Sequence, residues 1–120
     1  MSSKPPKADC LFCRIIAGEI PSTKVHEDDL VVAIRDINPQ APTHILLMPR
    51  THIVSADDLT AEHAQLLGRT FEVSARLARD EGIAGDGYRV VTNIGRNGGQ
   101  SVDHLHFHLL GGRRFTWPPG

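Results

Sequence analysis

The sequence carries almost no net charge and contains no long apolar run. Its 13 basic and 14 acidic side chains give a formal net charge of -1, which argues against binding to a nucleic-acid backbone, because such binding needs a basic surface. No apolar stretch approaches the roughly 20 residues that cross a bilayer, and the first residues lack the apolar core of a signal peptide. We therefore expect a cytoplasmic protein that binds neither nucleic acid nor membrane, whereas a small phosphorylated ligand needs only a local site.

With 120 residues, the chain is long enough for one hydrophobic core and too short for two. Residues 1–8 contain two prolines, two serines and two lysines, and this segment has too little apolar content to pack. We expect a disordered tail over residues 1–8 and a single domain over residues 9–120.

The most informative segment, residues 101–110, has histidines at the alternate positions 104, 106 and 108. Side chains in a strand alternate between the two faces, so His104, His106 and His108 are expected to share one face. Neutral imidazole is a good nucleophile toward phosphorus and exchanges protons near physiological pH. The segment therefore predicts a row of imidazoles with a catalytic role, and a half-exposed strand that carries histidines by chance is the alternative. The opposite face is expected to pack in the core through Leu105, Phe107 and Leu109.

A turn-rich loop, residues 93–101, leads into the histidine segment. Gly98 and Gly99 permit backbone conformations closed to other residues and let a ligand approach the main chain. Exposed N–H groups in such a loop can bind an anion. Beside a row of imidazoles, the loop predicts a phosphate pocket, to which three polar side chains contribute: Asn93, Gln100 and Ser101.

Two helices are expected. A short one covers residues 10–17, with Asp9 as its N-cap and Gly18 at its end. A long one runs from Thr60 to about Glu81, because apolar residues recur there at intervals of three and four. Its expected buried stripe is Ala64, Leu67, Phe71, Ala75 and Ala78.

Four further segments have the composition of strands: residues 24–27, 30–35, 43–49 and 88–93. With the histidine segment they predict an α+β domain, in which a five-stranded antiparallel sheet packs with one long and one short helix. Two other histidines are expected at the surface, His26 at a strand edge and His63 away from the helical stripe.

Residues spread along the chain resemble the histidine triad superfamily of nucleotide hydrolases and transferases. The run Gly99-Gln100-Ser101-Val102, followed by His104-x-His106-x-His108, carries the strongest resemblance. Other segments are similar to its histidine triad nucleotide-binding branch: Phe12-x-x-Ile15-Ile16, Glu19-Ile20-Pro21, Asp36-Ile37, Pro39-Gln40-Ala41-Pro42-Thr43-His44 and Trp117-Pro118-Pro119-Gly120. The resemblance covers the chain from about Asp9 onward.

The resemblance implies a division of labour among the histidines. His106 is expected to attack the α-phosphorus and form a nucleotidyl-histidine intermediate, which water then hydrolyses. His108 and Ser101 are expected to contact the phosphate or the leaving group, while His104 and His44 orient the rings. The remaining nucleotide-binding residues are expected to be Asp36 at the ribose, Ile37 at the base, Asn93 near the ribose and phosphate, Gly99 and Gln100 in the phosphate pocket, and Phe12 and Ile15.

The expected activity is that of a purine nucleoside phosphoramidase, which hydrolyses the P–N bond of adenosine 5′-phosphoramidates such as adenylylated lysine. Two other functions stay open. One is a nucleotide-binding interaction protein with incidental hydrolysis, and the other is a dinucleoside polyphosphate hydrolase of the same superfamily, a branch that usually lacks the Trp-Pro-Pro-Gly ending. No metal ion is expected to be required for catalysis, since hydrogen-bond donors can stabilise the developing charge.

The pair Cys10-x-x-Cys13 has the spacing of two ligands of a tetrahedral metal site. Some bacterial members of the resembled family complete such a pair with histidines that correspond to His52 and His104, which implies a structural zinc site. Two ordinary thiols are the alternative. A redox motif of thioredoxin type is disfavoured because the pair does not follow a strand.

The resemblance also implies a homodimer whose sheets join across a two-fold axis. Phe115 and Trp117 are large apolar groups in a proline-containing tail, residues 113–120, which we expect to reach toward the partner's active site. The sequence departs from the family pattern at Arg35, where a histidine is frequent, and at Ile94, where an acidic residue is frequent. Both departures bear on the choice of leaving group.

Overall fold

The computed structural model describes residues 9–120, so the tail expected over residues 1–8 lies outside the described residues. No helix in this part of the chain has the length and apolar character needed to span a membrane. The elements are, in order, α1 (Leu11–Ile16), β1 (Lys24–Glu27), β2 (Val31–Arg35), β3 (Thr43–Pro49), the short 3₁₀ helices η1 (Ala56–Asp58) and η2 (Ala61–His63), α2 (Ala64–Asp80), β4 (Tyr88–Val91) and β5 (Phe107–Gly111).

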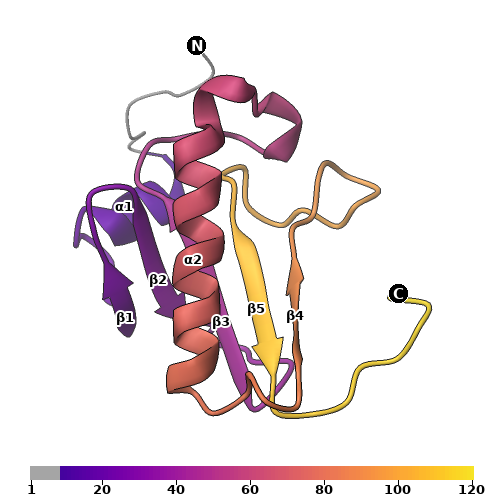
Figure 1. Ribbon diagram of the computed structural model, residues 1–120. Coiled ribbons are helices and arrows are strands. Elements are labelled where there is room, and N and C mark those ends of the chain that lie inside the picture. The colour runs from indigo at the N-terminus through magenta and orange to yellow at the C-terminus, as the bar shows by residue number, and fades with distance from the viewer. Residues whose placement is uncertain (1–8) are drawn as a thin grey trace.

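The five strands form one antiparallel sheet in the order β1-β2-β3-β5-β4. The predicted α+β architecture is therefore confirmed, with α2 as the long helix and α1 as the short one. Helix α2 lies across one face of the sheet, and the last residues of the chain run out beyond β4 (Figure 1). This order places β5, which carries the histidine His108, between β3 and β4.

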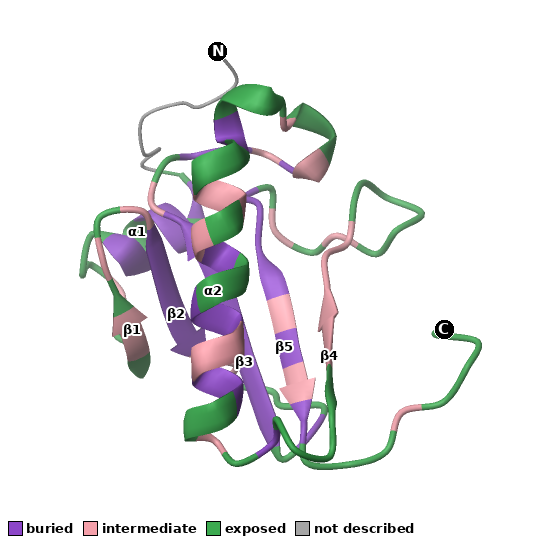
Figure 2. Ribbon diagram, in the orientation of Figure 1, coloured by how far each residue is buried: buried purple, intermediate pink, exposed green. Residues whose placement is uncertain are grey.

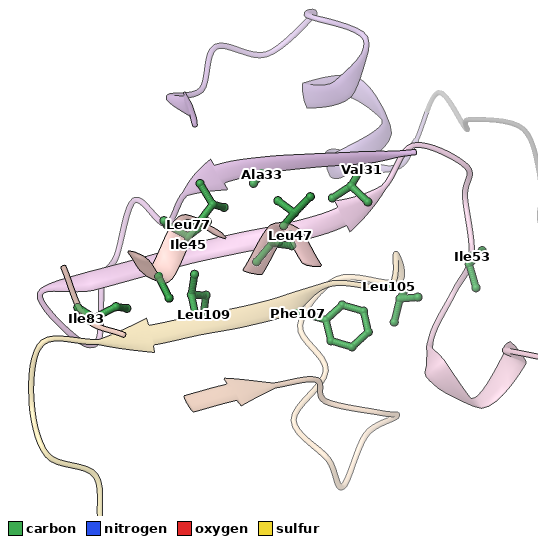
Figure 3. Packing of buried hydrophobic residues seen from close by; sticks show 12 residues of the cluster. Val31, Ala33, Ile45, Leu47, Ile53, Leu77, Ile83, Leu105, Phe107 and Leu109 are labelled. Atoms are coloured by element: carbon green, nitrogen blue, oxygen red, sulfur yellow. The ribbon is translucent and has the colours of Figure 1, made fainter. Parts of the chain in front are cut away.

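Alternate residues of the central strands belong to two hydrophobic clusters on opposite faces of the sheet. β3 is buried along its whole length because it packs on both faces, whereas β1 and β4 are only partly covered (Figure 2). The cluster beneath α2 includes Val31, Ala33, Ile45, Leu47, Leu77 and Leu109 (Figure 3). The cluster beneath α1 includes Phe12, Ile15, Val32, Ile34, Leu46 and Met48.

Helix α1 begins at Leu11, one residue later than predicted, because Cys10 and not Asp9 is its N-cap. The Cys10 sulfur accepts a hydrogen bond from the main-chain N–H of Cys13 at 3.3 Å. The helix ends at Ile16, one residue before the predicted end, with Ala17 as its C-cap. Gly18 follows with a φ of 82°, a conformation that glycine adopts without strain.

The predicted stripe of α2 is right in part: Ala78 is buried and Leu67 packs, partly buried, against the same cluster, whereas Ala64 is exposed. Phe71 is 51% exposed and meets only the edge of the Phe107 ring, at 5.7 Å between centroids. Polar Thr70 is buried instead, because its hydroxyl donates to the Leu66 carbonyl at 2.8 Å. The residues that α2 buries are Thr70, Val73, Ser74, Leu77 and Ala78.

Both histidines expected at the surface are covered. His63 is buried, and its Nδ1 accepts a hydrogen bond from the main-chain N–H of Thr60 at 2.9 Å, completing a capping box at the start of η2. The His26 side chain is 8% exposed and lies between Asp28, at 2.6 Å, and Arg76. These partners satisfy the ring nitrogens, which explains why burial is tolerated.

Candidate active site

The histidine segment alternates as predicted, although its strand is shorter than predicted. The ladder of β5 begins at Phe107, so the expectation of a strand from Ser101 is wrong. The main-chain N–H of Leu105 donates instead to the Ile53 carbonyl at 2.6 Å, so the segment meets the loop after β3 before it enters the sheet. Leu105, Phe107 and Leu109 all join the cluster beneath α2.

The three imidazoles lie in a row on the other face. The ring of Phe12 meets the rings of His104 and His106 edge-on, at 5.9 and 5.0 Å between centroids. The rings of His106 and His108 follow at 5.1 Å, and those of His108 and His44 at 5.2 Å. The structure thus brings together the four histidines for which catalytic roles were expected.

The orientation of the His106 ring fixes its tautomer. Its Nδ1 lies 2.8 Å from the main-chain carbonyl of His104. A carbonyl can only accept, so Nδ1 carries the hydrogen and Nε2 keeps an unshared lone pair. The residue as a whole is buried, with 4% of its surface exposed. A neutral ring held in this way can use its Nε2 lone pair as a nucleophile or as a hydrogen-bond acceptor.

A second fixed tautomer occurs at His44. The main-chain N–H of Gln40 donates to His44 Nδ1 at 3.0 Å, so the proton of the neutral ring is on Nε2. His44 Nε2 lies 2.9 Å from His108 Nδ1 and 3.4 Å from a carboxylate oxygen of Asp36. His44 therefore donates to His108, whose own hydrogen is on Nε2.

Burial keeps these rings uncharged at neutral pH. Burial, together with the nearby His106 and His44 rings, lowers the pKa of His108 to about 4 against the opposing effect of Asp36. Burial also lowers the pKa of His44, again against the charge of Asp36. Neither ring is therefore a cation at pH 7, and each offers one N–H as a neutral hydrogen-bond donor.

A hollow of about 500 Å³ opens beside His44 and His108. Asn93, Arg89 and Arg113 are among the residues that line it. Both guanidinium groups lie over the ring of Phe115, at 5.2 and 4.3 Å from its centroid. The end of the chain also lines this hollow through Pro119 and Gly120, whereas Trp117 is 82% exposed.

Asp36 and Ile37 occupy the turn between β2 and β3. One carboxylate oxygen of Asp36 accepts a hydrogen bond from the Asn38 N–H at 2.8 Å, and the other faces His44. Ile37 is 99% exposed, so its side chain is accessible to a ligand. Phe12 and Ile15, by contrast, are buried in the cluster beneath α1.

The glycine loop is held by Gln100. Its side-chain amide donates to the carbonyls of Val54 and Val102, and its oxygen accepts from the Gly95 N–H at 2.9 Å. Gly98 is required there, since a Cβ would lie 2.3 Å from the Ile94 carbonyl oxygen. Ser101 lines a second hollow, together with Cys10 and His52. It is not among the residues that line the hollow beside His108.

Cys10, Cys13, His52 and His104 form a buried cluster whose ligand atoms all lie within 4.8 Å of one another. His104 Nε2 lies 2.9 Å from the Pro49 carbonyl and donates to it, which leaves Nδ1 unprotonated and facing the Cys10 sulfur at 3.3 Å. A histidine that binds a metal usually donates its other N–H to a carbonyl in this way. The residues therefore fit a tetrahedral zinc ion.

A second group of possible ligands, Asp36, His44 and His108, is also compact. Here the tautomers oppose metal binding. Because the Gln40 N–H occupies the lone pair on His44 Nδ1, the nitrogen that faces the group carries the proton. This group is built to pass hydrogen bonds rather than to hold a cation.

Sequence reasoning missed the main-chain partners that set the tautomers, namely Gln40 N–H and the carbonyls of Pro49 and His104. It also missed Arg89 and Arg113 in the hollow. Gln40 lies inside a recognised motif, but main-chain hydrogen bonds leave no signal in the residue type.

The sheet and its row of imidazoles together define a histidine triad protein. Comparison with known proteins agrees, since the model of the HIT domain matches residues 17–115. The chain belongs to the HIT domain family.

Individual relatives are similar over most of their length. The purine nucleoside phosphoramidase of Escherichia coli (strain K12) is 56% identical over 105 residues, which are 88% of each chain. A 14 kDa zinc-binding protein of Zea mays is 51% identical over 115 residues, 92% of this chain and 87% of the relative. The crystal structure of a HIT family hydrolase from Legionella pneumophila superposes with a TM-score of 0.92 at 50% identity, covering 93% of this chain and 100% of the other. The protein is accordingly a hydrolase.

Proposed function

We propose that the protein hydrolyses the P–N bond of adenosine 5′-phosphoramidates, such as adenylylated lysine, to AMP and an amine. The observation that carries the proposal is the fixed ring of His106, whose Nδ1–H is engaged by a carbonyl while Nε2 presents a lone pair. The similarity to a purine nucleoside phosphoramidase supports the substrate class.

The reaction takes two steps on the α-phosphorus. First, His106 Nε2 forms a bond to phosphorus, and the P–N bond breaks with its electron pair passing to the leaving nitrogen. Water then attacks phosphorus, releases AMP and frees His106. Over both steps one water is consumed, with its hydroxyl on phosphorus and its proton on the departing amine.

The remaining residues bind the nucleotide and stabilise charge. His108 directs its Nε2–H toward the leaving group, since its Nδ1 is engaged by His44. Asp36 and Ile37 bind the ribose and the base, while Asn93 binds near the ribose and phosphate. Gly99 and Gln100 line the phosphate pocket, while their N–H groups hold the loop together through main-chain carbonyls. Ser101 donates to the phosphate, and with the Nε2–H of His108 it stabilises the developing charge without a metal ion. Phe12 and Ile15 support this site from α1, where Phe12 packs against the His106 ring.

We further propose that Cys10, Cys13, His52 and His104 hold a structural zinc ion. When bound, the ion would tie α1 to the histidine segment and would supply no chemistry to the reaction. The similarity to a protein named for zinc binding supports this assignment.

We also propose that two copies form a homodimer. Phe71 and Trp117 are large apolar side chains that a single chain leaves 51% and 82% exposed, and exposed aromatic groups favour an interface. In the dimer, residues 113–120 would approach the partner's site.

One comparison tests the function. The same preparation is assayed with an adenosine phosphoramidate and with a diadenosine polyphosphate, and we expect much faster turnover of the phosphoramidate. Faster cleavage of the polyphosphate would favour a dinucleoside polyphosphate hydrolase instead. Saturable AMP binding without turnover of either compound would favour a nucleotide-binding interaction protein.

A further inference from the structure

We infer that the main-chain N–H of Gln40 is a positioning group for this reaction, because it sets, through His44, which ring nitrogen of His108 carries the proton. The inference rests on the proposed function and adds a residue to it. Gln40 itself is exposed and lies in the turn between β2 and β3.

The argument follows three nitrogen atoms in sequence. An amide N–H can only donate, so its contact of 3.0 Å with His44 Nδ1 excludes a proton there in the neutral ring. The proton must then be on His44 Nε2, which lies 2.9 Å from His108 Nδ1. His108 Nδ1 is thereby an acceptor, and its hydrogen is on Nε2, the nitrogen left for the substrate.

The turn that carries this N–H is fixed from several sides. Its ends are joined by a hydrogen bond from the Asp36 N–H to the His44 carbonyl at 3.0 Å. Arg113 Nε donates to the Gln40 carbonyl at 3.1 Å, and this binds the turn to the chain that follows β5. Gly112 packs so closely that a Cβ there would lie 2.8 Å from the Pro42 ring. The amide is therefore held in place independently of any ligand.

Without this N–H, His44 is free to carry its proton on Nδ1. His108 would then donate from Nδ1 to His44 and present a lone pair, which repels the electron pair of a departing nitrogen. Asp36 lies 3.4 Å from His44 Nε2 and favours a proton there too. Because Asp36 acts in the same direction over a longer distance, we expect a partial effect on the rate, about tenfold.

The effect should depend on the leaving group. An amine leaves with its charge concentrated on one nitrogen and gains most from a hydrogen-bond donor at that atom. A 4-nitrophenolate spreads its charge over the ring and gains little. A disturbance of the fold, by contrast, would slow both substrates alike.

The test replaces the amide between Pro39 and Gln40 with an ester, which removes the N–H and keeps every side chain. The matched control is the same replacement one residue on, at Ala41. We expect the ester at residue 40 to lower kcat for the phosphoramidate about tenfold at constant KM, while kcat for the 4-nitrophenyl ester of AMP changes less than about twofold. Gln40→Pro, which also lacks the main-chain N–H, should likewise lower kcat for the phosphoramidate more than kcat for the 4-nitrophenyl ester.

A spectroscopic measurement needs no substrate and no variant that must fold. Imidazole ¹⁵N shifts of the wild-type protein should show the hydrogen on Nε2 of both His44 and His108. Hydrogen on Nδ1 of His44 in the wild type would overturn the inference. An equal loss of kcat with the phosphoramidate and with the 4-nitrophenyl ester, in the protein with the ester at residue 40, would overturn it too. Failure of the wild type to cleave the phosphoramidate would instead refute the proposed function, whatever the tautomers are.

Discussion

Arg35, at the end of β2, binds Glu81, at the C-terminal end of α2, through two parallel hydrogen bonds of 2.9 Å. The contact raises the pKa of Arg35 and lowers the pKa of Glu81. Arg35 directly precedes Asp36, so this ion pair fixes the start of the turn that faces His44. The arginine that departs from the family pattern thus has a structural partner of its own.

Arg35→Ala should lower the free energy of unfolding by about 0.5 to 1 kcal/mol, because the pair is partly exposed and solvent screens it. The same variant should raise KM for the nucleotide slightly, since the turn that carries Asp36 loses one of its supports and keeps the hydrogen bond from the Asp36 N–H to the His44 carbonyl. Urea unfolding of Arg35→Ala, Glu81→Gln and the double variant measures the coupling of the pair. Strictly additive losses would show that the two side chains do not stabilise each other.

Stability should fall as the pH is lowered from about 6.5 toward 4. The unfolded chain protonates His108 near its ordinary pKa of about 6.5, whereas burial lowers its pKa in the folded protein to about 4. Between these values the unfolded state binds more protons, so acid favours unfolding, and the buried His44 acts in the same direction. The urea midpoints of unfolding at pH 7 and pH 5 measure this loss of stability, and the difference between the two midpoints should be smaller in His108→Asn. An equal change in the variant would contradict the assignment to His108.

His106→Ala should abolish turnover and keep nucleotide binding, because it removes the nucleophile. His104→Ala should leave a measurable rate, since His106 is held by the main-chain carbonyl of His104 and not by its ring. Intact mass during turnover of a slow phosphoramidate should reveal a nucleotidyl adduct on the wild type and none on His106→Ala. Normal turnover by His106→Ala would show that another group is the nucleophile.

Zinc should co-purify at about one ion per chain, because two thiolates and two imidazoles make a complete structural site. Cys13→Ser should lose the metal and lower the melting temperature. Activity of the chelated, still folded protein should persist, because the ion would take no part in the reaction. Metal analysis decides the first point, and less than about 0.1 zinc per chain would leave Cys10 and Cys13 as ordinary thiols.

The sequence predicts the sheet well because its strands alternate or are buried on both faces, patterns that residue types record directly. It predicts the buried face of α2 poorly, because polar Thr70 is buried through a hydrogen bond to a main-chain carbonyl and Phe71 is half exposed. His63 is hidden for a similar reason, as the cap of a turn.

The same limit applies within the site. Alternation placed His104, His106 and His108 on one face, but their protonation depends on three main-chain atoms, the N–H of Gln40 and the carbonyls of Pro49 and His104. Every residue supplies a main-chain carbonyl, and every residue except proline supplies an N–H, so only the folded chain reveals that these atoms meet the rings.

Deleting Thr116 to Gly120 should alter substrate preference more than stability. Trp117 is 82% exposed in the single chain, and most of this segment is exposed, so its loss removes little buried area. The segment nevertheless lines the hollow beside His108 through Pro119 and Gly120, while its first residue, Thr116, accepts a hydrogen bond from Arg89 at 3.0 Å. The deletion would therefore remove the hydrogen bond of Arg89 to Thr116, while its contact with the Phe115 ring stays. It would also widen the space for the leaving group, and the ratio of kcat/KM for small and large amines should change several-fold. Competition assays with two phosphoramidates measure the preference, and sedimentation at micromolar concentration measures the oligomeric state. A monomer with unaltered preference and full activity would contradict both the role of the tail and the proposed dimer.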